Sequence, residues 1–195
     1  MALDAKYVYA PTPLQSTTTG AVAVAPEGTT MPTTATATLP STWDDGGYVS
    51  EDGISITVTR STTPIKDWSK ANVRNLLTDF GGTIALAFLQ VDQFAAERVF
   101  GEDNVTVTPA TTTAGEQIKV SIGAELPPIE AWCFSMKDGD ARIRVCVPRG
   151  QITDVNQIDF KPDAGHVIGG TLATYDDGTG NSIYVIYDDG TVVSG

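Results

Sequence analysis

Five oxygen-bearing side chains near the C-terminus are the residues of this chain best suited to hold a metal ion. They occur in two similar stretches, D-D-G-T-G-N and D-D-G-T. Calcium prefers several carboxylate and amide oxygens, but this spacing is not that of an EF-hand and no acidic residue closes the loop. The same residue types are what a β-turn with positive φ requires. We therefore interpret these stretches as turns, with calcium binding as the alternative. The five residues are Asp176, Asp177, Asn181, Asp188 and Asp189.

The residues that could act as nucleophiles or general bases do not form a recognisable catalytic set. His166 is the single histidine, and the chain has no G-x-S-x-G motif. Cys133 and Cys146 lack the clustering of a zinc site and, apart from flanking arginines, the cationic or helix-terminal setting of an activated thiol. Gly169 and Gly170 lie in a strand-like pattern and not in a phosphate-binding loop. We expect no enzymatic activity, no catalytic or cofactor-binding residue, and no metal.

The charge balance argues against one class of partner. The 195 residues include 12 Lys+Arg and 24 Asp+Glu, for a net charge of −12 and a pI near 4.3. Binding nucleic acid by neutralising phosphates needs clustered cations, which this composition does not favour. The excess of acidic residues either serves solubility alone or gives the wall of a pore a negative charge that repels a polyanion passing through it.

Length and segment character place the chain among proteins that fold as one domain, or one domain plus arms. The N-terminus lacks the basic region and apolar core of a signal peptide. No apolar run approaches the roughly 20 residues that a membrane-spanning helix needs. We expect synthesis in a cytoplasm and no membrane partner.

Residues 11–42 differ in composition from the rest of the chain. They are rich in Thr and Pro and poor in large aliphatic residues, although V-A-V-A-P at Val22–Pro26 could form one strand. The segment is either a flexible tail or an arm that orders against a neighbouring subunit. The strand and the following Trp43 slightly favour the arm.

The middle of the chain has the alternation of β-strands, followed by one helix. Residues 54–60 alternate, residues 61–72 break the pattern at Pro64, and residues 73–91 resume it with a bend or bulge at Gly81-Gly82. Both faces of residues 83–91 are apolar, which predicts burial on both sides. Asp92 is a good N-cap for a helix over 93–100, and Gly101 is a good residue to end it.

The clearest hairpin pairs residues 130–137 with residues 140–147 through a type I′ turn at Asp138-Gly139. This register predicts a core face containing Trp132 and Phe134, and a polar face that carries Arg142 and Arg144. It places Cys133 opposite Arg144 and Cys146 opposite Ala131, so we expect no intrachain disulfide.

The remaining strands complete a mainly β fold. Residues 117–123 alternate with Ile118, Val120 and Ile122 inward, and strands are expected at 151–161, 166–175 and 181–187, the last two as a hairpin. With about nine strands and one short helix, we expect an antiparallel β-sandwich or barrel.

The order of several phrases along the chain resembles one protein family. The arm contains V-A-V-A-P-E-G-T, and G-Y-V-S-E-D-G-I, P-I-K-D-W, a long strand pair and a helix ending at Phe100-Gly101 follow in turn. This succession is similar to the major tail (tail tube) proteins of long-tailed, non-contractile bacteriophages, and looks closest to those of actinobacterial phages.

The resemblance implies a virion structural protein of tail tube type. Its subunits form hexameric rings that stack into a tube, and inner strands close a β-barrel around a lumen for genome delivery. The implied domains are an N-terminal arm at 1–45 and a β-sandwich domain at 46–195, with an inter-ring loop at 50–72 and the helix on the outer side. The implied partners are copies of the chain itself, a tape measure protein in the lumen, and tail terminator and distal tail proteins at the ends. DNA passes through without specific binding.

Nine residues are candidates for contacts between subunits or rings. Trp43 and Trp68 lie in polar, loop-like stretches, and exposed indoles are enriched at interfaces, although core packing is the alternative. Arg142 and Arg144 could pair with a neighbour's carboxylates, or lie on a solvated face. The candidates are Trp43, Asp44, Asp45, Ile65, Lys66, Asp67, Trp68, Arg142 and Arg144.

Two other functions compete with the tail tube hypothesis. A β-sandwich binding module, carbohydrate-binding or adhesin-like, should be monomeric and carry an aromatic platform, whereas the aromatic residues here mostly fall on faces predicted to be buried. A secretion-apparatus tube protein would share the fold, but its usual sequence pattern is absent.

Overall fold

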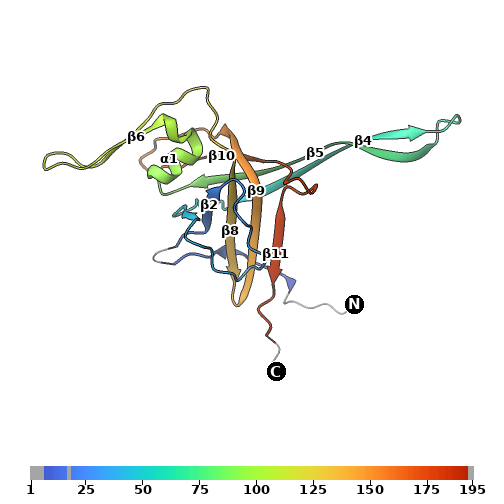
Figure 1. Ribbon diagram of the computed structural model, residues 1–195, viewed down its shortest axis with the longest axis horizontal. Coiled ribbons are helices and arrows are strands. Elements are labelled where there is room, and N and C mark those ends of the chain that lie inside the picture. The colour runs from blue at the N-terminus through green and yellow to red at the C-terminus, as the bar shows by residue number, and fades with distance from the viewer. Residues whose placement is uncertain (1–6, 17–18, 193–195) are drawn as a thin grey trace.

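The computed structural model describes residues 7–16 and 19–192 and shows a mainly β protein with antiparallel strand pairing throughout (Figure 1). In this part of the chain no helix is both long and apolar enough to cross a membrane. The elements are β1 (Thr12–Pro13), β2 (Val22–Pro26), β3 (Asp44–Asp45), β4 (Ser55–Lys66), β5 (Asn72–Phe88), α1 (Gln93–Phe100), the 3₁₀ turn η2 (Glu102–Asn104), β6 (Val105–Thr108), β7 (Gln117–Val120), β8 (Glu130–Asp138), β9 (Ala141–Val155), β10 (Ile168–Thr174) and β11 (Tyr184–Asp188).

One large sheet and one small hairpin contain all the described strands. The large sheet has the order β3-β2-β8-β9-β10-β5-β4, with β1 also on β8 and β11 also on β9. β9 pairs with β11 through residues 142–146 and with β10 through residues 150–155. The expected hairpin between the last two strands is therefore wrong, because both strands lie along β9. The turn residues at 176–181 mark a reversal of the chain, but they do not determine the partner strand.

The main core lies between the large sheet and α1. Its largest fully buried side chains are Trp132, Phe88 and Phe134, and the two aromatic rings of β8 stack with centroids 6.3 Å apart. Val22 and Val24 belong to this core, because β2 pairs with β8 in its own subunit. The strand expected inside residues 11–42 thus exists, and it is part of the domain's own sheet.

The predicted helix is confirmed. The Asp92 carboxylate accepts a hydrogen bond from the Ala95 amide at 3.0 Å, and Gly101 follows the last turn with φ of 91°. One face of the helix is buried against the sheet. It consists of Ala95, Ala96, Val99 and Phe100.

β4 and β5 form a long hairpin that extends away from the body of the molecule (Figure 1). The excursion expected at 61–72 is mostly strand, and only its last residues form the turn. Pro64 is accommodated because β4 is an outer strand with a single described neighbour. The extra residues lie at Val73 and Thr78 of β5, so the bulge expected at Gly81-Gly82 is wrong.

The burial expected on both faces of residues 83–91 is also wrong. Ile84, Leu86 and Phe88 lie in the core, whereas Ala85, Leu89 and Val91 on the opposite face are exposed.

The β8–β9 hairpin has a different turn from the one predicted. Asp138 pairs with Ala141, Gly139 has φ of 56°, and Asp140 is not among the residues with positive φ. Glycine at the first central position defines a type II′ turn. The register shifts by two residues, which keeps every side chain on its predicted face but changes each partner. Cys133 is therefore directly opposite Cys146.

The face of this hairpin predicted to be polar is instead a second small core. Ala25, Trp43, Ala131, Cys133 and Cys146 are buried there, with Met31 and Leu39 packed against them. We call residues 31–43 the cover segment, because they lie over this face. Small side chains on the strands leave room for this segment, which has no periodicity that predicts its position.

The β6–β7 hairpin leaves the body on the side opposite the β4–β5 hairpin (Figure 1). Val120 packs against the main core and Ile118 is half-buried, as predicted. Ile122 lies beyond β7 and is exposed, so its inward orientation is wrong.

Candidate assembly surfaces

The most exposed apolar surface of the described chain is the β4–β5 hairpin. We call residues 55–80 the projecting hairpin, and every one of them is exposed. Exposed large hydrophobic side chains gathered on one element make it a candidate site of protein contact. Its large hydrophobic residues are Ile56, Val58, Ile65, Trp68, Val73, Leu76, Leu77 and Phe80.

One face of the projecting hairpin continues the core face of the domain. Ile56 is opposite Ile84, a core residue, and cross-strand partners share a face. Further out, the Arg60 guanidinium lies 5.8 Å from the centroid of the Phe80 ring. Leu77 follows, opposite Thr62. The apolar stripe thus extends past the last core residue to a part of the hairpin where no described segment of its own subunit buries it.

Four of the predicted contact residues lie at or next to the tip of this hairpin. Ile65 and Lys66 end β4, and the Trp68 side chain is 103% exposed. Asp67 organises the turn, because its carboxylate accepts hydrogen bonds from the Ser69 hydroxyl at 2.7 Å and the Ala71 amide at 2.8 Å. The first of these bonds is the main reason that the pKa of Asp67 is lowered.

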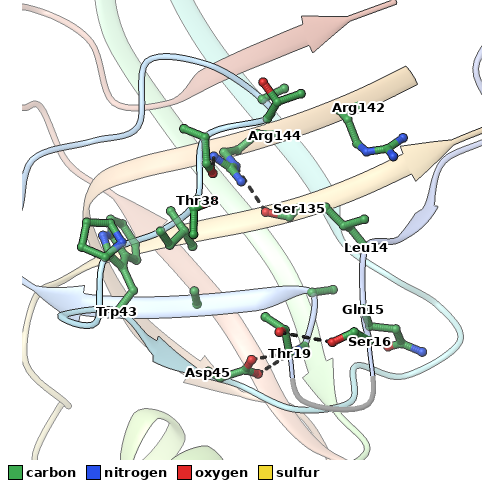
Figure 2. Close-up of a pocket in the computed structure, with 18 residues that line it drawn as sticks. Leu14, Gln15, Ser16, Thr19, Thr38, Trp43, Asp45, Ser135, Arg142 and Arg144 are labelled. Carbon is green, nitrogen blue, oxygen red and sulfur yellow. Dashed lines mark hydrogen bonds between the residues drawn. The ribbon is translucent and has the colours of Figure 1, made fainter. Parts of the chain in front are cut away.

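Trp43 and Arg144 have a different setting, inside the subunit. Arg144 is 4% exposed, and its guanidinium donates to the carbonyls of Thr34 at 3.0 Å and Ala37 at 2.8 Å. Figure 2 shows the same group beside Ser135. Trp43 is 8% exposed in the second core. Both residues hold the cover segment on their own subunit, and the intersubunit contact expected of them stays a prediction.

Trp43 and Arg144 also line a cavity of about 490 Å³ between the cover segment and β8–β9 (Figure 2). Arg142 is at its edge and donates to the carbonyls of Gly139 and Ala141. Among the described residues that line this cavity there is no histidine, cysteine or glutamate.

Asp44 and Asp45 join the end of the cover segment to the rest of the domain. Asp45 accepts hydrogen bonds from the amides of Gly20 and Gly47, at 2.6 Å and 2.9 Å for the shortest contact of each. Asp44 forms an ion pair of 3.3 Å with Arg98 of α1.

Arg98 also pairs with Glu130 of β8, at 3.1 Å. Burial raises the pKa of Glu130 to about 7, although the charge of Arg98 opposes this and Asp44 adds to it. Sequence reasoning missed both residues. Two signals in the sequence could have indicated them. Arg98 is a cation in the last turn of the helix, and Glu130 is an acid at the start of a strand of buried residues.

The acidic turn near the C-terminus uses its carboxylates locally. Asp177 accepts hydrogen bonds from the Tyr184 hydroxyl and from Thr179, and the first of these is the main reason that its pKa is lowered to about 2. Asp176 accepts from the Gly178 amide. In the described ranges no three His, Cys, Asp or Glu residues are placed to hold a metal ion. The contacts of Asp176 and Asp177 are those expected of turn residues.

His166 has structural contacts. Its Nδ1 lies 3.1 Å from the Asp159 carbonyl oxygen, and its ring stacks on Phe160 with centroids 4.5 Å apart.

An antiparallel β domain whose long hairpin projects from the body and carries exposed apolar residues has the features of a subunit that associates with other chains. The sequence profile of one family, described as phage tail tube protein, matches residues 11–194, and the chain belongs to this family. The predicted tail tube resemblance and the mainly β fold are confirmed, and the protein is a structural component of the virion tail. No curated protein shows significant sequence similarity to the chain.

Proposed function

We propose that the chain polymerises as stacked hexameric rings into the tail tube, the conduit for genome delivery into the host. The observation that carries this proposal is the projecting hairpin. A two-stranded ribbon exposed on both faces is marginal in water, and this one carries eight large hydrophobic side chains. Contact with a neighbouring subunit would bury them.

The sheet edges support closure of a barrel between chains. β4 and β3 end the order of the large sheet, so each presents one edge without a described partner strand. Unpaired edges promote association with other chains, and joining them in a ring removes them. Inner strands of six subunits would then form a continuous barrel around the lumen.

The tip of the projecting hairpin is the proposed contact between rings. Ile65, Lys66, Asp67 and Trp68 lie at or beside this tip, within the loop at 50–72 assigned to stacking. The arm at 1–45, with Trp43, Asp44 and Asp45, and the pair Arg142 and Arg144 are proposed to support contacts with adjacent subunits. Residues 1–6 and 17–18 of this arm lie outside the described part of the chain.

The net charge of −12 suits a lumen through which DNA passes without binding. The further proposed partners are a tape measure protein inside the tube, and tail terminator and distal tail proteins at its ends. The protein would be made in the host cytoplasm, and the kinship with actinobacterial phages is part of the same proposal.

The test is light scattering coupled to size-exclusion chromatography over a range of protein concentrations. The full chain should form hexamers or larger multiples. Leu77→Asp should reduce their mass, because it puts a charge into the apolar stripe that a neighbouring subunit would bury. Ile122→Asp, at an exposed apolar residue outside the projecting hairpin, is the matched control and should assemble normally. A chain that stays monomeric at every concentration, or equal loss in both variants, contradicts the proposal.

A further inference from the structure

Cys133 and Cys146 form a closely spaced pair in the middle of the large sheet. They are direct cross-strand partners on β8 and β9, and their Sγ atoms are 3.4 Å apart. Both are free thiols with no exposed surface. The function proposed above does not use them.

The backbone position of the pair matches what a disulfide requires. The Ser135 amide donates to the Ala21 carbonyl, and the Ser135 carbonyl accepts from the Leu14 amide, so this residue directs both groups away from β9. Cys133, two residues earlier on the same strand, has the same orientation. The cysteines therefore occupy a non-hydrogen-bonded pair, where Cα atoms are about 4.5 Å apart in antiparallel sheets. Disulfides span Cα separations of about 4.4–6.8 Å.

The two sulfurs also differ in acidity. The hydrogen bond between the two sulfurs lowers the pKa of Cys146; burial opposes this, and the charge of Arg144 adds a smaller lowering. The same hydrogen bond raises the pKa of Cys133. A thiolate is the reactive species in disulfide exchange, so we take Cys146 as the attacking sulfur.

We propose that Cys133 and Cys146 are a modification site, at which a low-molecular-weight disulfide oxidises the pair to an intrachain disulfide linking β8 to β9. The Cys146 thiolate attacks one sulfur of the oxidant, forming a mixed disulfide and releasing one small thiolate. Cys133 then loses its proton and attacks Cys146 Sγ, releasing the second small thiolate. Two protein thiols become one disulfide, and the oxidant is reduced to two thiols.

The cover segment controls access to this site. Met31, Leu39 and Trp43 pack against the cluster that contains both cysteines. Tyr184 and Ile186 of β11 pack there as well, and Cys146 lines a cavity between β11 and the start of the cover segment. Movement of the cover segment away from β8–β9 would widen access to the buried sulfurs, so the oxidation rate should rise with the opening of this segment.

The test exposes reduced full-length chain to oxidised glutathione and follows intact mass and the thiols that remain after unfolding. We expect loss of two hydrogen atoms, no remaining thiol, and a non-reduced peptide joining Cys133 to Cys146. Cys133→Ser should stop at the mixed disulfide on Cys146. Leu39→Ala, or urea below the unfolding transition, should increase the oxidation rate several-fold.

Three results would contradict the proposed disulfide site. They are two glutathione adducts per chain, disulfides between chains, or two intact thiols both in native buffer and in sub-transition urea. Both cysteines belong to one subunit and the readout is a peptide link within one chain, so the outcome can be scored whether or not the chain assembles into rings. The urea arm also keeps the test decisive if Leu39→Ala fails to fold.

Discussion

Individual buried charges tie the N-terminal part of the chain to the domain. Arg144 holds the cover segment through two backbone carbonyls, and Arg98 joins Asp44 of β3 to Glu130 of β8. A guanidinium presents several donors in a fixed geometry, which suits it to this bridging role. Residues that the sequence suggested for contacts between subunits therefore also stabilise the subunit itself.

Arg144→Ala should destabilise the subunit much more than Arg142→Ala. Removal of Arg144 leaves two carbonyl oxygens of the cover segment, those of Thr34 and Ala37, without their donor, at a cost of about 2–4 kcal/mol. Arg142 lies at the edge of the turn and its loss should cost less than about 1 kcal/mol. Urea unfolding of the monomer measures both, and equal costs would contradict the anchoring role of Arg144.

Glu130 should make stability depend on pH. Its folded pKa of about 7 lies above the unfolded value. The stabilisation that the protonated carboxyl group gives the folded state is therefore fully present below the unfolded pKa and is lost as pH rises through the folded pKa. Relative to Glu130→Gln, the wild-type free energy of unfolding should fall by about 1–2 kcal/mol between about pH 5 and about pH 8, less than the full shift because solvent screens this partly exposed carboxylate. Parallel stability curves for the two proteins would contradict this assignment.

At the scale of elements, the predictions that the structure confirms were based on periodic patterns and on capping residues. The alternation in β8 and β9 identified the core face correctly, and capping residues located α1 to the residue. Strand partners were wrong where two arrangements share the same alternation, as in the two-residue shift that pairs Cys133 with Cys146. The cover segment was not predicted, because it has no periodic pattern and is ordered only by contacts with residues far along the chain.

The turn between β8 and β9 offers a check of the positive φ observed at Gly139. Gly139→Ala should destabilise by about 1–2 kcal/mol, because φ at this position is positive and a side chain is strained there. Gly81→Ala is the matched control: its added Cβ also meets open space, but φ at this position is not positive. That substitution should be neutral or stabilise by about 0.5 kcal/mol. Thermal or urea unfolding compares the two, and a similar effect at both positions would argue against the type II′ turn.

At the scale of the whole molecule, the chain folds as a compact sheet and helix from which two hairpins extend in opposite directions (Figure 1). The core is complete without a partner, whereas the projecting hairpin and the outer edges of β3 and β4 are not covered by the described chain. Membership of the tail tube family is consistent with this arrangement, because tube subunits must contact other subunits. We infer that the body makes each subunit stable and the projections join subunits together.

Electron microscopy of the concentrated, purified full-length chain tests this central claim most directly. The account predicts hollow tubes or rings whose end views have six-fold symmetry, with the projecting hairpin at the boundary between successive rings. Particles of a different symmetry, or contacts that leave the projecting hairpin in solvent, would contradict it.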